Sequence, residues 1–157
     1  MKAKKSGLAV LVVILGIVGL SDSAVGSEVP LPDDINIVAP ATDLPPEIRA
    51  FSGKWTGKWD GFQDAILIVE QISFNDTLMV YAWSKVPIRQ KSTNGYKRFK
   101  AKVYVVPKPL IEFEINRVDQ PLITFEIQKD LNTIKGFWVW IVGNGRQVMR
   151  IVMKRAD

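Results

Sequence analysis

The residues that most often do chemistry are missing from this chain, because none of its 157 residues is histidine or cysteine. Imidazole is the commonest general base and a frequent metal ligand, and thiolates act as nucleophiles and zinc ligands. Imidazole-based triads, thiol catalysis, disulfides and thiolate metal sites are therefore excluded. We expect a protein that is not an enzyme and that carries neither a metal nor a cofactor.

Two carboxylates come nearest to a catalytic arrangement. Glu112 and Glu114 are two residues apart, which in a strand places them on one face about 7 Å apart, a spacing that resembles a glycosidase pair. If the two segments form a hairpin, Lys100 and Lys102 lie on the same face of it as the two glutamates. Nearby cations keep carboxyl groups ionised, so we interpret the four residues as ion pairs.

The stretch 85–102 has seven basic residues and no acidic one, with Tyr96 and Phe99 interleaved. In a cytosolic protein this composition would indicate nucleic-acid binding. The beginning of the chain, however, predicts export, and we therefore expect no nucleic-acid partner.

Residues 1–26 have the pattern of a secretory signal. Three lysines precede the uncharged run Gly7–Leu20, and small residues at 24 and 26 suit a cleavage site. The run is shorter than the ~20 residues that span a bilayer. We predict cleavage before Ser27 and a periplasmic or secreted protein. An uncleaved N-terminal membrane anchor is the alternative.

The rest divides into a spacer, residues 27–46, and one β-domain, residues 47–157. The spacer contains five prolines and only acidic charges, whereas the domain is basic. The spacer is either a solvated tail or an acidic segment that covers a basic site of the domain. Near its end, Thr42 or Asp43 could cap a short helix that places Ile48 and Phe51 on one face.

Eight short β-type runs follow, separated by turn-forming residues. They are expected at Lys54–Asp60, Ala65–Ile72, Thr77–Ser84, Tyr96–Val106, Leu110–Asn116, Leu122–Gln128, Thr133–Val142 and Gln147–Lys154. The connections are too short for crossover helices, so the strands must be antiparallel. The prediction is an all-β, eight-stranded up-and-down barrel; a two-sheet β-sandwich is the alternative. Folding one hairpin about Pro107 pairs Lys102 with Glu112 and Val103 with Ile111.

The first strand carries a doubled Gly-x-Trp, formed by Gly53 and Trp55 and by Gly57 and Trp59. A Gly-x-Trp after a short helical turn resembles the lipocalin-like (calycin) barrels, and also small exported bacterial proteins without an assigned function. The resemblance covers about residues 45–155 and implies that Trp55 plugs the closed end beneath a basic residue of the last strand. Arg155 continues the inward-facing alternation of Met149, Ile151 and Met153 in the last strand, and we expect it to be this basic residue. The short strands and the lack of cysteine depart from typical lipocalins.

In an eight-stranded meander, alternate loops share the end opposite Trp55. The basic residues expected at this mouth are Lys85, Arg89, Lys91, Arg117 and Arg146. A basic rim over an apolar interior suits a small amphiphile with an anionic head, although the same residues would also suit a solvated loop face. The aromatic residues could equally fill an eight-stranded barrel completely.

The second and third strands are apolar on both faces. The outward set is Ile66, Ile68, Leu78 and Val80. Either the segment 43–51 covers this face, or it binds a protein partner or a second copy of the chain. A filled barrel that uses this face for protein interaction is the rival function to ligand binding.

Overall fold

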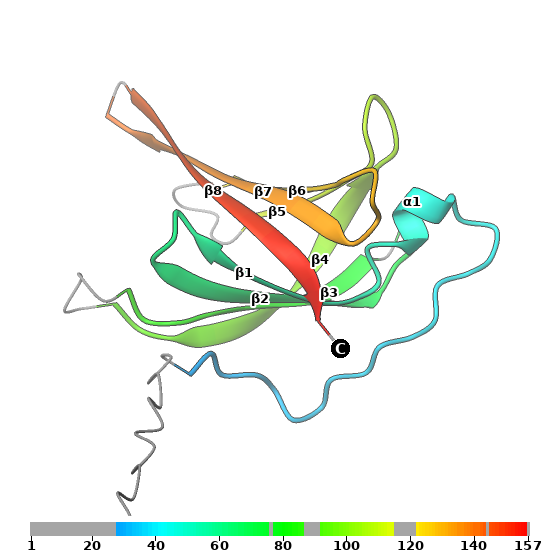
Figure 1. Ribbon diagram of the computed structural model, residues 1–157, viewed down its shortest axis with the longest axis horizontal. Helices are drawn as coiled ribbons and strands as arrows, with labels where there is room; N and C mark the ends of the chain where they lie inside the picture. The colour runs from blue at the N-terminus through cyan, green and yellow to red at the C-terminus, as the bar shows by residue number, and fades with distance from the viewer. Residues whose placement is uncertain (1–27, 76, 87–91, 115–121, 144, 157) are drawn as a thin grey trace, which may run out of the picture.

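The computed structural model describes residues 28–75, 77–86, 92–114, 122–143 and 145–156. The strands are β1 (Gly53–Trp59), β2 (Gln63–Gln71), β3 (Thr77–Trp83), β4 (Gly95–Tyr104), β5 (Leu110–Glu114), β6 (Leu122–Ile127), β7 (Thr133–Val142) and β8 (Gly145–Ala156). Each pairs with the next, and β8 pairs with β1, which closes an antiparallel barrel (Figure 1). The up-and-down barrel is thus confirmed over the sandwich.

Alternation of apolar and polar residues decides which face of each strand turns inward. In β6, Ile123, Phe125 and Ile127 are buried while the residues between them are partly exposed. The register predicted for one hairpin is confirmed, because Lys102 pairs with Glu112 and Val103 with Ile111.

Strand ends differ from expectation where turns were misjudged. β8 begins at Gly145 rather than Gln147, because the turn at Gly143 adopts a positive φ of 59° and Val142 already pairs with Gly145. β4 ends at Tyr104, before the prolines of the following loop, which have no N–H to offer a ladder.

A single helical turn, α1 (Pro46–Arg49), closes one end of the barrel (Figure 1). Its N-cap is Pro45, without a side-chain cap, so capping by Thr42 or Asp43 was wrong. The proline pair already fixes the φ values that begin a helix. Ile48 and Phe51 are fully buried in the barrel core, as expected from their spacing.

Residues 28–38, which we call the strap, lie over the outer face of β2 to β4 (Figure 1). The Val38 N–H donates to the Glu70 carbonyl (2.7 Å), and Arg98 binds Asp34. Beneath the strap, Ile68 and Val80 are at most 1% exposed. The prediction that segment 43–51 covers this face was wrong, because Leu44, Ile48 and Phe51 belong to the core at the barrel end.

Aromatic side chains fill the interior. Consecutive ring contacts join Phe99 to Phe113, Phe113 to Phe125 and Phe125 to Trp59, with centroids 4.9–6.4 Å apart. At Gly136 an added Cβ would lie 2.5 Å from Phe125 and from Ile151. The barrel centre therefore has the packing of a core, and space for a ligand must be sought at its ends.

Candidate functional site

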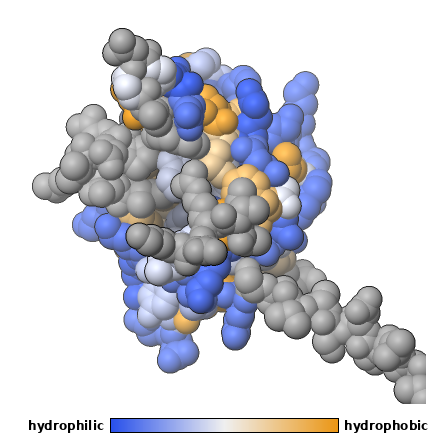
Figure 2. Space-filling model, turned by 90° about the vertical axis from the view of Figure 1, so that its left-hand side faces the viewer, coloured by the Kyte–Doolittle hydropathy of each residue, from blue (hydrophilic) through white to orange (hydrophobic). Residues whose placement is uncertain are grey.

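The end opposite α1 carries an apolar cup lined by Gln63, Tyr81, Trp83 and Trp138, with a volume of about 220 Å³. Strands β1, β3 and β7 finish at this end, and β2, β4, β6 and β8 begin there. Figure 2 faces this side of the molecule, where apolar patches are visible among hydrophilic residues. We call this feature the mouth cup.

Tyr81 forms the inner wall of the mouth cup and is 1% exposed. Its hydroxyl oxygen accepts a 2.6 Å hydrogen bond from Trp59 Nε1. Burial raises the pKa of Tyr81, while the hydrogen bond from Trp59 acts in the opposite direction. The phenol therefore stays neutral and serves as a fixed polar point in an apolar wall, not as a base.

Two further hydrogen bonds fix the other side of the cup. Gln63 Nε2 donates to the Ser84 carbonyl (3.0 Å), and Trp83 Nε1 donates to the Thr93 carbonyl (3.1 Å). The Trp83 ring stacks on Tyr81 with centroids 5.8 Å apart. At Gly95, opposite Trp83, a Cβ would come within 3.1 Å of the indole, so the glycine makes room for this ring.

Lys97 supplies positive charge at the mouth. It pairs with Tyr81 across β3 and β4, is exposed, and its ammonium lies 5.2 Å from the centre of the Phe99 ring. Lys97 was not among the predicted mouth residues, although it alternates in step with the inward-facing Phe99. Trp83 was also not predicted. Both faces of β3 are apolar, so alternation does not show which face turns into the barrel.

The predicted mouth residues divide. Arg89, Lys91 and Arg117 lie outside the described residues, and Lys85 is exposed just after β3. Arg146 pairs with Ile141 and shares parity with Val148 and Arg150, which places it on the outer face of the β7–β8 hairpin. It therefore does not line the mouth cup.

At the closed end, the Arg155 guanidinium carbon lies 4.4 Å from the centre of the Trp55 ring, inside the ~6 Å of a cation–π contact. The guanidinium also donates to the carbonyls of Ser52 (2.8 Å) and Ala50. Trp55 is fully buried and donates to the Phe51 carbonyl (2.8 Å). Gly53, with φ of 113°, has Arg155 2.9 Å from its would-be Cβ. These contacts join the last strand to the turn before the first, with Trp55 buried and Arg155 exposed above it.

The remaining sequence candidates offer no reactive centre. Glu112 and Glu114 line a pocket of about 210 Å³ together with Lys100 and Lys102, and Glu112 accepts a hydrogen bond from the Tyr104 hydroxyl (3.3 Å). Within the described ranges, no three carboxylates gather as a metal site would require. No helix in the described part of the chain is long and apolar enough to cross a membrane.

Comparison of the chain with protein-family models, with curated proteins and with solved structures finds no match. The barrel and its two ends must therefore be interpreted from their own geometry.

Proposed function

We propose that this is a non-catalytic, exported binding protein of lipocalin-like type, whose mouth cup holds the apolar end of a small anionic amphiphile. The single observation that carries the proposal is the mouth cup itself. Trp83, Trp138 and Tyr81 provide apolar walls, and Gln63 adds a buried polar group. A concave apolar site with a few fixed polar groups is typical of small-molecule binding.

Cup volume sets the size of the ligand. A cavity of about 150 Å³ suffices for benzene, whereas drug-sized ligands occupy roughly 300–1,000 Å³. The cup, at about 220 Å³, suits one ring or a short aliphatic chain. Lys97 at the mouth favours a negative head group. Octanoate is therefore a suitable probe, and palmitate is too long for the packed interior.

Lipocalin-like architecture is proposed on two supports, the closed eight-stranded meander and the Trp55–Arg155 contact at one end. Export is proposed on the sequence of residues 1–26, which lie outside the described residues. The rival proposal, a protein partner on Ile66, Ile68, Leu78 and Val80, is weakened because Ile68 and Val80 are covered by the strap.

Titration calorimetry with octanoate tests the proposal. Trp83→Ala should weaken binding about tenfold, which corresponds to ~1.4 kcal/mol of lost contact, and Lys97→Gln should weaken it several-fold, mainly at low salt. Tyr104→Ala, an exposed aromatic near the closed end of β4, is the matched control. Equal affinity in all four proteins, or no binding by the unaltered chain, would refute a site in the mouth cup.

A further inference from the structure

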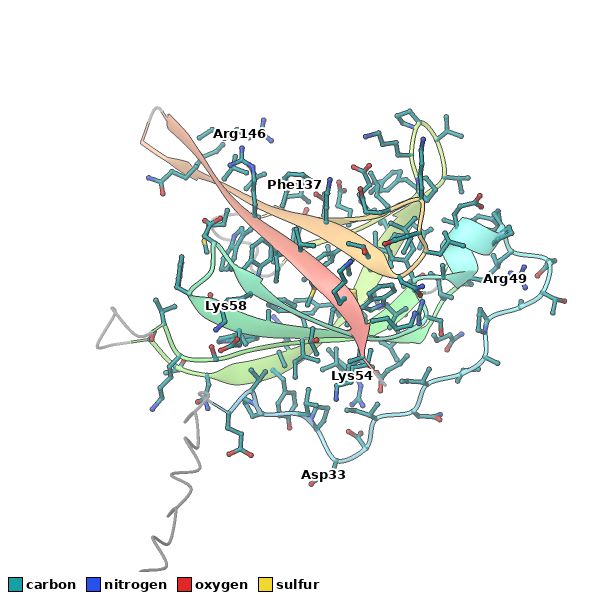
Figure 3. All side chains as sticks on the ribbon, in the orientation of Figure 1. Asp33, Arg49, Lys54, Lys58, Phe137 and Arg146 are labelled. Carbon is teal, nitrogen blue, oxygen red and sulfur yellow. The ribbon has the colours of Figure 1, made fainter. Side chains whose placement is uncertain are left out.

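The β7–β8 hairpin presents an outer face that we call the hairpin face. Along β7 and β8, outward-facing residues alternate with inward-facing ones such as Ile134, Ile151 and Met153, which are buried inside the barrel. The face itself consists of Lys135, Phe137, Val139 and Ile141 on β7 and Arg146, Val148, Arg150 and Val152 on β8. Figure 3 labels Phe137 and Arg146 on this hairpin, which extends beyond the rest of the barrel.

Aliphatic side chains on the hairpin face are exposed to an unusual degree. Ile141 is 75% exposed, Val152 is 53% exposed and Val148 is 38% exposed. The strap, which covers the apolar outer residues of β2 and β3, lies on other strands. Apolar exposure of this kind on one projecting element is a mark of an interaction surface.

The charge of the hairpin face has one sign, because neither β7 nor β8 contains Asp or Glu. Neighbouring carboxylates are engaged with other groups. Asp64 pairs with Lys58, Glu126 with Lys108 and Asp130 with Lys154, and Asp60 accepts the backbone N–H of Arg150. In the described part of the chain, the guanidinium groups of Arg146 and Arg150 form no ion pair.

We propose that the hairpin face docks on the surface of a bilayer that contains anionic lipid. Three of the four cross-strand pairs of the hairpin face join a cation to an apolar residue, among them Ile141 with Arg146 and Phe137 with Arg150. Such a mixture meets both requirements of an interfacial site, because arginines bind lipid phosphates while aliphatic groups enter the boundary with the acyl chains. A projecting hairpin can reach that depth while the barrel remains in water. The inference does not depend on the mouth cup.

The chain has no cysteine, so Ile141→Cys in the full-length protein accepts a single environment-sensitive fluorophore. The probe membranes are vesicles of phosphatidylcholine alone and of phosphatidylcholine with an equal amount of phosphatidylglycerol. We expect the label at position 141 to brighten and shift to the blue only with phosphatidylglycerol present. The same label on Val106→Cys, a position 82% exposed after β4, should not respond. Because the readout is local, membrane insertion of residues 1–26 cannot imitate it.

Charge variants complete the test. Each cation near an anionic surface contributes about a five-fold increase in binding, so Arg146→Gln with Arg150→Gln should raise the lipid concentration at half-response about 25-fold. Lys100→Gln with Lys102→Gln, two exposed positions on β4, is the matched control and should change it little. A silent label at position 141, a response equal on both vesicle types, or equal losses in both variant pairs would overturn the proposal. Binding to a soluble polyanion without any vesicle response would overturn it as well.

Discussion

At the closed end, one guanidinium joins the last strand to the turn that precedes the first. Arg155 covers the Trp55 ring and holds the carbonyls of Ser52 and Ala50. We expect Trp55→Ala to lower the free energy of unfolding by about 3–5 kcal/mol, as a large-to-small change in a packed core. Arg155→Lys keeps the charge but loses the planar, two-pronged geometry, and should cost about 1–2 kcal/mol. Urea denaturation measures both, and similar losses in the two variants would contradict this ranking.

Tyr81 links the core to the mouth cup through one buried hydrogen bond. Tyr81→Phe keeps the ring but leaves the Trp59 indole N–H without its acceptor. A buried unsatisfied donor costs about 1–3 kcal/mol, so the unfolding free energy should fall by that amount in chemical denaturation. Tyr104→Phe removes an exposed hydroxyl and should change it little. An equal effect of the two substitutions would show that the Trp59 bond contributes nothing to stability.

The strap is held mainly by one charged cluster. Arg98 donates to Glu70 (2.8 and 3.0 Å) and to Asp34 (3.0 Å). Arg98→Gln should release the strap while the barrel stays folded, because the substituted group lies outside the core. Hydrogen exchange at the Val38 amide, which donates to Glu70, should then become faster by tenfold or more. Lys100→Gln, on the same outer face of β4, should leave it unchanged; protection retained in Arg98→Gln would disprove the clamp.

Attachment of the strap should also depend on pH. The hydrogen bond from Arg98 lowers the pKa of Glu70 below its ordinary value of 4.5, against the opposing effect of burial. A carboxyl with a lowered pKa stabilises the attached state above its ordinary pKa, and this contribution disappears as the pH falls through the lowered value. Val38 exchange, corrected for its intrinsic pH dependence, should therefore accelerate only below about pH 4.5. Arg98 also lowers the pKa of Asp34 on the strap, so Glu70→Gln combined with Asp34→Asn should remove this transition, and a transition that survives in the double variant would point to another group.

Elements of this protein were predictable to different degrees because their stabilising contacts differ in range. Alternation and turn residues are local signals, and they gave the eight strands, their order and the Lys102–Glu112 register. The strap shows no regular spacing of hydrophobic residues. Its position depends on the contact of Asp34 with Arg98, which is 64 residues away in the chain. A mouth was expected at this end, but the residues that line the mouth cup were not predicted for a similar reason, since Gln63 and Trp138 come together only through barrel closure.

At the scale of the whole molecule, closure of the barrel separates three surfaces with different properties. The closed end is sealed by α1 and Arg155, the strap covers β2 to β4, and the hairpin face is open and basic. The mouth cup leads toward the interior, where Phe113 is packed against Tyr81, Phe99 and Phe125. The filled core, rather than the strand count, therefore limits what the barrel can hold.

Phe113→Ala should change that limit. Loss of the ring beneath Tyr81 opens a void next to the mouth cup at a cost of about 3–5 kcal/mol in stability, so binding is measured at a temperature where the variant stays folded. We expect the variant to bind dodecanoate better relative to octanoate than the unaltered chain does. Ile127→Ala, a core truncation near the closed end, is the control for general loosening and should leave the ratio of the two affinities unchanged. A ratio that Phe113→Ala also leaves unchanged would mean that the interior does not set ligand length, and the mouth cup would then be an isolated surface depression.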